Sequence, residues 1–510
     1  MTQRRFRHAA VVSALALAAL IGFGVGERKP AQAQDATPSA RTLRPPAPPC
    51  RATPGDIDSL KLTLSAFEQA RLGFRRKAIT GYYGVGNPRD RAWFDRLPAM
   101  EAVQAISAHL ADIGKTLALV YDIGRQEGRS WVCAWLLSAN GLEAAATVPL
   151  PEVAPPQLVQ TGLRVTTREA ARAPALRASR AGKGLEKCPT VETGPARDGL
   201  PSLTEEQTTV ARDALSRVAD LLLPPAIRKR LAERDYRRLL ILPAGDLSTV
   251  PFAALPVEGA RALIDHAAIV VLASVEGLFN AERLGQRILR PSPLSSAKKA
   301  RGAGSLVVGD PDLSKDPKFC FAPLPHARTE AEFVGRSVQT TPLIGPRASI
   351  ASVKSWLAAH AETATFLYFA THGMADAMNP MDESFLATAG AHLYGRDIRS
   401  LRLPAQPLVV MSACQSGLGK AFEGGVFGLA RAWHSAGAPQ VVMSLWNVDD
   451  LATKLLMEDF VARIVQGTPA EFALQEAMRA ARDRMPATAT QMPDPALWSG
   501  FALFGLPSID

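Results

Sequence analysis

The sequence predicts an α/β fold with a mostly parallel central sheet that helices cover on both faces. Short, continuous apolar runs such as Leu239–Leu242 and Leu408–Met411 are typical of strands buried on both faces. Helix-like segments separate these runs from about residue 204 onward, as crossovers between parallel strands require. The composition, with 47% hydrophobic and 21% charged residues, is that of a folded globular protein and excludes a chain that is disordered throughout.

The first 33 residues have the three-part layout of a secretory signal peptide. A basic stretch at residues 4–8 precedes an uncharged, mostly apolar run at residues 9–26, and Ala31-Gln32-Ala33 forms an A-x-A cleavage pattern. We therefore expect cleavage near Ala33 and an exported protein, either periplasmic or secreted. An uncleaved membrane anchor is the alternative, because an uncharged run of this length lies at the short end of what spans a bilayer.

The composition changes after this segment. Residues 34–56 are rich in proline and predict an extended linker. Residues 57–113 carry apolar side chains at helical intervals and predict a small helical region. Two short β-prone runs follow at Leu117–Tyr121 and Trp131–Leu137, and we expect them to form adjacent strands.

Strands and helices alternate in the rest of the chain. Thr204, followed by Glu205 and Glu206, is a typical helix start. Residues 289–304 combine prolines, glycines and basic residues, which predicts a flexible linker. We expect strands at 239–242, 269–272, 305–308, 366–370, 408–411 and 440–445, and helices at 204–222, 327–338, 349–360, 393–402, 424–436 and 449–466.

Two of these strands end in reactive side chains. His372 follows the first of them, at 366–370, and Cys414 follows the second, at 408–411. Sites in open parallel sheets form beyond the carboxyl ends of the strands, so neighbouring strands would bring the two residues to one edge. An imidazole beside a thiol favours the nucleophilic thiolate. The backbone N–H groups of Gly373 and Cys414 are candidate donors to an oxyanion.

Each residue also has an ordinary structural interpretation. A lone cysteine at a strand end is often a small core residue, and a lone histidine is often structural. The pattern of residues alone leaves the catalytic and the structural interpretations evenly balanced.

Three segments resemble a CHAT domain, a family of caspase-like cysteine peptidases that is often associated with tetratricopeptide repeats. They read FLYFATHGMAD, LVVMSACQSGLGKAFEGG and LLILPAGDLSTVPFAALPVEG, and the resemblance covers roughly residues 115–510. It implies a caspase/separase-like three-layer α/β/α sandwich. It also implies a His–Cys dyad that falls on His372 and Cys414. No tetratricopeptide repeats are evident ahead of the domain.

The resemblance also implies how the chain divides. A CHAT domain at 114–510 would consist of a pseudo-caspase half at 114–288, the basic linker at 289–304 and an active half at 305–510. The small helical region would precede it.

Related caspase-like peptidases place a carboxylate in the pocket for a basic substrate residue, where it pairs with Arg or Lys. The candidates here are Asp376, Glu423, Asp449 and Asp450. Asp449 has an alternative role as a helix N-cap, and Asp450 as a first-turn acid that complements the helix dipole.

The sequence therefore predicts an exported cysteine endopeptidase in which Cys414 attacks and His372 acts as acid and base. This chemistry needs no cofactor, and we expect no metal site because CxxC and HExxH spacings are missing. The expected partners are a protein or peptide substrate and a regulatory protein. A non-catalytic scaffold that binds a protein partner is the alternative.

The net charge and the cysteine count fit this interpretation. The formal charge is +10, and removal of residues 1–33 takes away five basic residues and one acidic residue, which lowers it to +6. No nucleic-acid-binding motif accompanies this charge. Five cysteines leave at least one thiol unpaired within the chain, and we expect this to be Cys414. The other four, Cys50, Cys133, Cys188 and Cys320, allow three pairings.

Overall fold

The computed structural model describes most of the chain. The described residues are 57–64, 98–126, 128–163, 175–176, 200, 203–259, 261–272, 304–321, 324–376, 379, 382–414, 428–488 and 491–508. The predicted signal peptide, the proline-rich linker, almost all of the basic linker and Glu423 lie outside these ranges. Every described residue belongs to the compact unit Pro48–Asp510, and the unit Met1–Ala47 has no described part.

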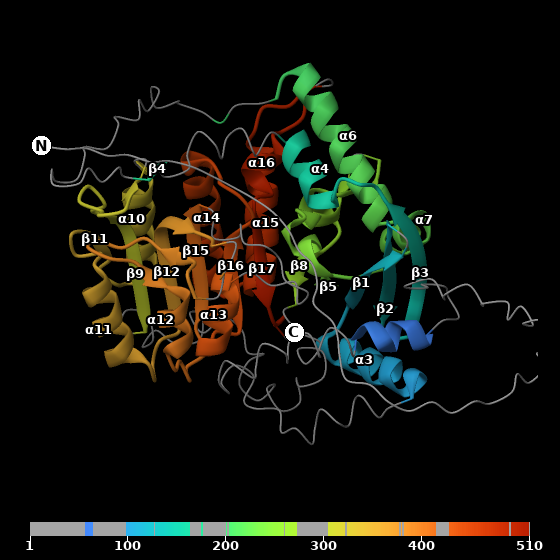
Figure 1. Ribbon diagram of the computed structural model, residues 1–510, viewed down its shortest axis with the longest axis horizontal. Helices are drawn as coiled ribbons and strands as arrows, with labels where there is room; N and C mark the ends of the chain where they lie inside the picture. Colours follow the sequence, from blue (N-terminus) through green and yellow to red (C-terminus); the bar gives the residue numbers. More distant parts are fainter. Residues whose placement is uncertain are drawn as a thin grey trace, which may run out of the picture. The chain divides into compact units, whose positions relative to one another are not determined.

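Most of the described strands belong to one large mixed sheet in which most neighbours are parallel, and β10–β4 and β6–β7 form two separate two-stranded sheets. Its carboxyl-terminal half has the order β11-β9-β12-β15-β16-β17, and all of these except β17 run in the same direction (Figure 1). The strands of this half, which we call the active half, are β9 (Ser305–Pro311), β11 (Leu343–Gly345), β12 (Phe366–Met374), β15 (Leu408–Cys414), β16 (Gln440–Ser444) and β17 (Phe501–Gly505).

The amino-terminal half continues the same sheet in the order β8-β5-β1-β2-β3. Because β17 is antiparallel to β16 and parallel to β8, the strands β8, β5 and β1 run in the direction of β17 and opposite to β9, β11, β12, β15 and β16. The carboxyl ends of the two sets therefore lie at opposite edges of the sheet. The strands of this half are β1 (Thr116–Gln126), β2 (Arg129–Ser138), β3 (Gly141–Leu150), β5 (Arg238–Leu242) and β8 (Ala268–Val271).

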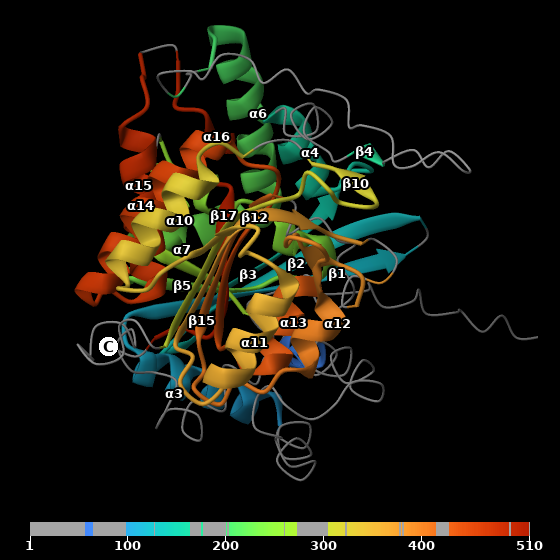
Figure 2. The same cartoon turned by 90° about the vertical axis from the view of Figure 1, so that its left-hand side faces the viewer.

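Helices cover both faces of the active half. Tyr368 of β12 reaches Glu330 on one face, and the neighbouring Phe369 packs against Trp433 on the other, as the alternation of side chains along a strand requires. Figure 2 shows the two layers side-on. The first contains α10 (Ala327–Ser337), α14 (Asp450–Gln466) and α15 (Ala470–Asp483), and the second contains α11 (Ile350–His360), α12 (Gly395–Ser400) and α13 (Gly428–Ala436).

Four longer helices accompany the amino-terminal half. Helix α6 begins where the sequence predicts, with Thr204 accepting the N–H of Gln207 while the Gln207 side chain accepts the N–H of Thr204. The apolar face of this helix packs toward β2 and β3. The four are α3 (Ala99–Ile113), α4 (Pro155–Gly162), α6 (Glu205–Leu222) and α7 (Pro225–Glu233).

Short elements complete the description. One group extends the sheet at the site edge or pairs beside it: β4 (Ala175–Leu176), β10 (Phe319–Cys320), β13 (Phe385–Leu386) and β14 (Leu393–Tyr394). The others are β6 (Pro256–Glu258), β7 (Arg261–Ala262), α16 (Pro495–Trp498) and three 3₁₀ turns at Gly245–Thr249, Phe252–Ala254 and Leu263–Asp265.

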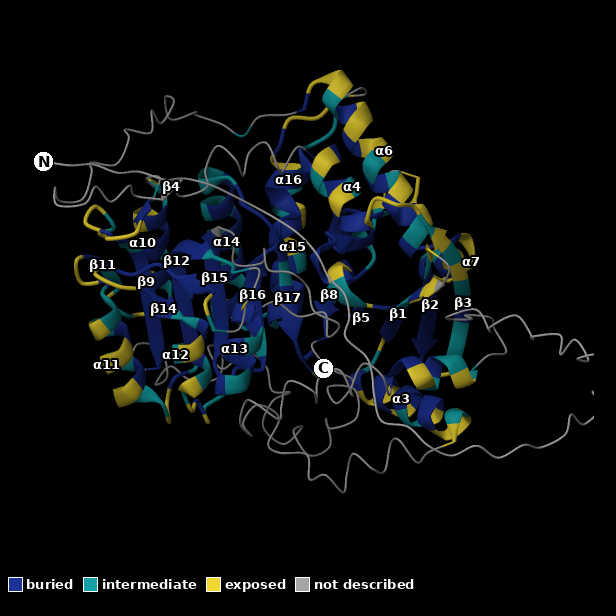
Figure 3. Cartoon of the chain, in the orientation of Figure 1, coloured by how far each residue is buried: buried dark blue, intermediate teal, exposed yellow. Residues whose placement is uncertain are grey.

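One continuous apolar core runs through both halves. The strands in the middle of the central sheet are buried almost throughout, whereas the edge strand β3 is buried only at Ala144 and Ala145 (Figure 3). The largest fully buried side chains of the core include Trp135 in the amino-terminal half and Trp433 and Trp446 in the active half. This arrangement confirms the predicted sandwich of a mostly parallel sheet between helices.

Two features bear on the environment of the chain. Cys133 and Cys320 each take part in a disulfide bond, so neither offers a free thiol. Within the described ranges, every helix is too short or too polar to span a bilayer.

Candidate active site

The candidate dyad lies at the carboxyl ends of two neighbouring strands. β12 and β15 are parallel neighbours, and their register pairs His372 directly with Cys414. Adjacent strands are separated by about 4.8 Å, so the backbones of His372 and Cys414 are direct neighbours across the sheet. The sequence predicted this only under the condition that the two strands are neighbours, and the sheet meets that condition.

Apolar runs explain why the two strands take these positions. Residues Phe366–Ala370 and Leu408–Met411 are buried on both sides, as the middle of an α/β sheet demands. The end of β15 is further tied to β16, because the Ser444 hydroxyl donates to the Ala413 carbonyl at 2.7 Å. The backbone that carries Cys414 therefore leaves a well-anchored strand.

The backbone around His372 is fixed by a short hairpin that the sequence did not predict. The His372 carbonyl accepts the N–H of Ala387 at 2.8 Å, and the Thr371 hydroxyl donates to the Ala387 carbonyl at 2.8 Å. Gly373, the other predicted oxyanion donor, lies in β12 opposite Leu386 of β13. The hairpin therefore fixes the main chain on both sides of the histidine.

The imidazole of His372 is mostly buried, with 8% of the residue exposed. Its ring lies 5.1 Å, centre to centre, from the ring of Phe321, which precedes α10. Phe321 belongs to an aromatic cluster that we call the His392 cluster, formed by Phe319, Phe321, Phe385, His392 and Tyr394. Sequence reasoning did not identify these residues, since nothing in their spacing signals a common location.

Three of the carboxylates predicted for the substrate pocket, Asp376, Asp449 and Asp450, accept hydrogen bonds from backbone N–H groups. Asp449 is the N-cap of α14 and accepts the N–H of Leu451 and of Ala452 at 3.0 and 3.1 Å, which confirms its alternative role. Asp450 accepts the N–H of His326, ahead of α10, at 2.9 Å.

Asp376 lies in the loop after β12, where its carboxylate accepts the N–H of Asn379 at 2.7 Å. Asp376 follows β12 and Asp450 follows β16, so both lie after strands of the active half. Glu423 lies outside the described residues.

A buried carboxyl that the sequence did not predict lies between α10 and β12. Glu330 of α10 accepts a hydrogen bond from the Tyr368 hydroxyl at 2.8 Å, on the helical layer of α10 and α14. Burial raises the pKa of this carboxyl to about 8, and the carboxylates of Asp450 and Glu458 act in the same direction. Glu330 is therefore largely protonated at neutral pH.

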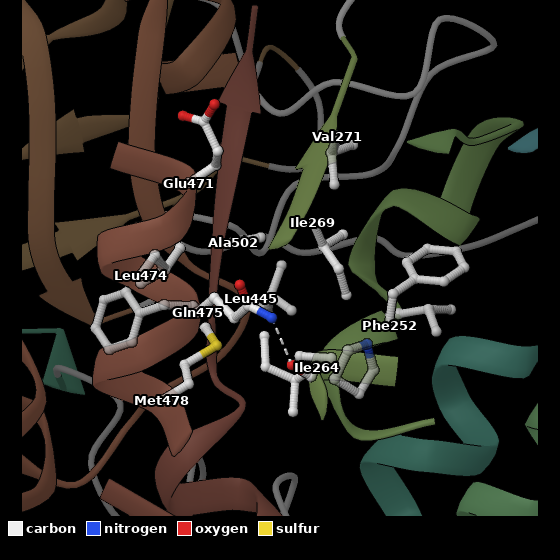
Figure 4. Close-up of a pocket in the computed structure, with 14 residues that line it drawn as sticks. Phe252, Ile264, Ile269, Val271, Leu445, Glu471, Leu474, Gln475, Met478 and Ala502 are labelled. Atoms are coloured by element: carbon white, nitrogen blue, oxygen red, sulfur yellow. Dashed lines mark hydrogen bonds between the residues drawn. The ribbon is translucent and has the colours of Figure 1, made fainter. Parts of the chain in front are cut away.

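A small cavity lies elsewhere, at the junction of the two halves (Figure 4). Its volume is about 20 Å³, which is room for roughly one water molecule. Apolar side chains from residues 250–253, β8, α15 and β17 line most of it, and Gln475 crosses it to donate to the Ile264 carbonyl at 2.8 Å. None of its lining residues comes from β12 or β15, so it is a packing void and not part of the candidate site.

Comparison with known proteins places this site in a family. The model of the CHAT domain matches residues 212–506. The chain is also similar to tetratricopeptide repeat protein 28 of Homo sapiens, at 26% identity over 356 residues, and to its Mus musculus counterpart, at 26% over 355 residues. These matches cover 61% of this chain and only 14% of either relative, so the chain spans a small part of the relatives' length.

Several solved structures are similar at low identity, and two of them serve as examples. The Saccharomyces cerevisiae separase–securin complex gives a TM-score of 0.47 at 11% identity, over 89% of this chain and 34% of that chain. The Arg-specific cysteine proteinase gingipain R gives 0.38 at 11% identity, over 59% and 69% of the two chains.

The family match and the sheet topology agree with each other. The segment that matches contains β12, β15 and both members of the candidate dyad. With the mixed sheet between two helical layers, the match confirms the caspase-like α/β/α sandwich that the resemblance implied. The match also covers more than half of the residues, and the chain belongs to the CHAT domain family.

Proposed function

We propose that this chain is an exported, caspase-like cysteine endopeptidase with Cys414 as nucleophile and His372 as general acid and base. The observation that carries the proposal is the paired register of these two residues at the carboxyl ends of parallel neighbours. Membership of the CHAT domain family supports it. A scaffold without catalysis would not require a thiol and an imidazole at paired positions.

The chemistry proceeds in two balanced stages. In the first, the Cys414 thiolate forms a bond to the scissile carbonyl carbon, and the C–N bond breaks as His372 gives its proton to the leaving amine. In the second, His372 takes a proton from water, the hydroxide attacks the thioester carbonyl, and the C–S bond breaks to release the thiolate. The backbone N–H groups of Gly373 and Cys414 stabilise the oxyanion in both stages. No cofactor takes part in either stage.

Cleavage after a basic residue is the substrate preference that we propose. Asp450 and Asp376 follow strands at the carboxyl edge of the active half, where a substrate would approach the dyad. A carboxylate there would pair with an Arg or Lys side chain through charge-assisted hydrogen bonds. Glu423 remains a candidate of the same kind, whereas the carboxylate of Asp449 caps α14 and we do not place it in the pocket.

Export is supported by two independent features. The first 33 residues have the layout of a signal peptide. Cys133 and Cys320 each take part in a disulfide bond, and such bonds persist mainly in oxidising compartments. We therefore propose a periplasmic or secreted protein that meets its protein or peptide substrate, and its regulator, outside the cytosol.

The proposal is tested by assaying the mature chain on a diverse peptide library, beside a Cys414→Ala variant. We expect cleavage by the wild-type chain and none by the variant. Cleavage that survives the substitution would rule out Cys414 as the nucleophile. If neither protein cleaves any peptide, with or without added extracellular proteins from the source cells as possible activators, the scaffold function is favoured.

A further inference from the structure

We infer that Phe321 is a positioning residue for His372, and that a buried pair of Asp316 and His392 holds Phe321 in place. The inference rests on the proposed peptidase function and adds a supporting group to the dyad. Phe321 comes from the segment before α10, about 50 residues ahead of the histidine in the sequence.

The contact between Phe321 and His372 covers one side of the imidazole. The two ring centres are 5.1 Å apart and the ring planes are inclined by 33°. Since the backbone of His372 is fixed by the β13 hairpin, the remaining freedom of the side chain lies in its two side-chain torsions. An aromatic ring packed on one side restricts both torsions and keeps water from that side.

Phe321 is in turn held by the His392 cluster. The ring of His392 meets Phe321 edge-on at 5.8 Å, and the ring of Phe319 lies 5.7 Å from it. His392 itself stacks on Phe385, with ring centres 4.1 Å apart and planes inclined by only 5°. The edge-on geometry of His392 against Phe321 is a favoured one for aromatic pairs.

Asp316 connects the two sides of this cluster. One of its carboxylate oxygens, Oδ2, lies 3.1 Å from Nε2 of His392. The other, Oδ1, accepts the N–H of Lys318 at 2.9 Å and of Phe319 at 2.7 Å. Asp316 thereby fixes the turn that leads into Phe321 and the imidazole that contacts it. Both Asp316 and His392 are buried, so water competes weakly for these contacts.

The disulfide at Cys320 adds a covalent restraint to the same segment. Cys320 lies between Phe319 and Phe321, and it belongs to β10. The segment that supports the histidine is thus held by a carboxylate, a set of aromatic contacts and a covalent bond. This concentration of restraints on one short segment is what a positioning role requires.

The test measures how fast Cys414 is alkylated by iodoacetamide as a function of pH, with the modified peptide quantified by mass spectrometry. An activated thiolate reacts with a midpoint well below that of an ordinary thiol, which lies near 8.5. We expect Phe321→Leu and Phe321→Ala to move the midpoint upward toward 8.5. We also expect kcat/KM for peptide cleavage to fall on the order of tenfold to a hundredfold, mainly through kcat.

Two further variants separate positioning from general stability. Phe321→Tyr keeps the ring and should keep the wild-type midpoint. Phe252→Leu removes a phenyl ring that packs at 5.9 Å against Tyr121 in the amino-terminal half, and it should lower the unfolding temperature without moving the midpoint. Asp316→Asn should move the midpoint in the same direction as Phe321→Leu, by a smaller amount.

The outcomes distinguish this inference from the proposed function. A low midpoint in the wild-type chain that is unchanged in folded Phe321→Leu would overturn the positioning role and leave the peptidase proposal intact. A wild-type midpoint near that of an ordinary thiol would contradict both. Thermal unfolding of each variant shows whether it is folded, and Phe321→Leu, which retains most of the apolar volume, serves if Phe321→Ala does not fold.

Discussion

Arg238 and Glu471 form an ion pair whose two side chains are completely buried. Nε of Arg238, at the start of β5, donates to Oε1 of Glu471 in the first turn of α15 at 3.1 Å. The N–H of Ser508 also donates to this oxygen at 2.9 Å. The pair therefore links β5 of the amino-terminal half, helix α15 and the backbone of Ser508 after β17.

Breaking this pair from one side should destabilise the whole unit. Arg238→Met or Glu471→Leu leaves an uncompensated buried charge, which costs on the order of 3–5 kcal/mol. The double variant removes both charges, and its cost should be clearly smaller than the sum of the two single costs. Urea denaturation of the four proteins measures these free energies of unfolding. Additive losses would show that the two groups act independently.

Asp450 and Asp449 are adjacent, and the structure predicts different results for their substitution. Asp450→Asn keeps an oxygen for the N–H of His326 but removes a negative charge from the carboxyl edge. We expect it to lower kcat/KM selectively for substrates with Arg or Lys before the scissile bond. Asp449→Ala is the matched control, because it removes an N-cap and should cost about 0.5–2 kcal/mol of stability without changing the preference.

Peptide-library profiles of the two variants provide the measurement. An unchanged preference in Asp450→Asn would remove Asp450 from the substrate pocket. The same profile would then direct attention to Asp376, which lies after β12.

Glu330 should make the stability of the protein depend on pH. Burial raises its folded-state pKa to about 8, against an ordinary value near 4.5 that applies to the unfolded chain. The contribution of Glu330 to the free energy of unfolding is therefore complete below about pH 4.5, and it is lost as the pH rises toward 8. At about 1.4 kcal/mol per pKa unit, the loss amounts to a few kcal/mol.

Glu330→Gln should flatten this dependence, because an amide retains an acceptor for Tyr368 and does not ionise. Urea unfolding at pH 5 and at pH 8.5 measures the effect. Glu332→Gln, on the same helix but only partly buried, is the control and should retain the wild-type pH dependence. A wild-type free energy of unfolding that does not fall between these two pH values would contradict the assignment.

The sequence predicts β9, β12, β15 and β16 of the active half because their signal is local, whereas β11 and β17 were not predicted. The runs at Phe366–Ala370 and Leu408–Met411 are continuous and apolar, and they become β12 and β15. β3 was not predicted, since Ala144–Ala146 in its centre have weak strand propensity. Helix α15 was also missed, although its apolar residues have helical spacing. The antiparallel pairing of β17 with β16 depends on contacts between distant segments, which no local pattern encodes.

The candidate site divides in the same way. His372 and Cys414 can be predicted because each follows a recognisable strand and because their motifs resemble a known family. Phe321, Asp316 and His392 cannot, since the contact of Phe321 with His372 and the pairing of Asp316 with His392 arise only from the packing of distant segments. Glu330 cannot be predicted either. An acidic residue in an amphipathic helix is usually exposed to solvent, and only the packing of α10 in the structure shows that this one is buried.

A double-mutant cycle on Cys414 and His372 tests the proposed dyad most directly. It measures kcat/KM on the best peptide from the library. If Cys414 and His372 act as one unit, Cys414→Ala and His372→Ala should each lower kcat/KM by a factor on the order of 10³ or more. The double variant should then be no worse than the more damaging single variant, because either change already disables the same step. Losses that multiply in the double variant, or activity that persists in Cys414→Ala, would contradict the central claim.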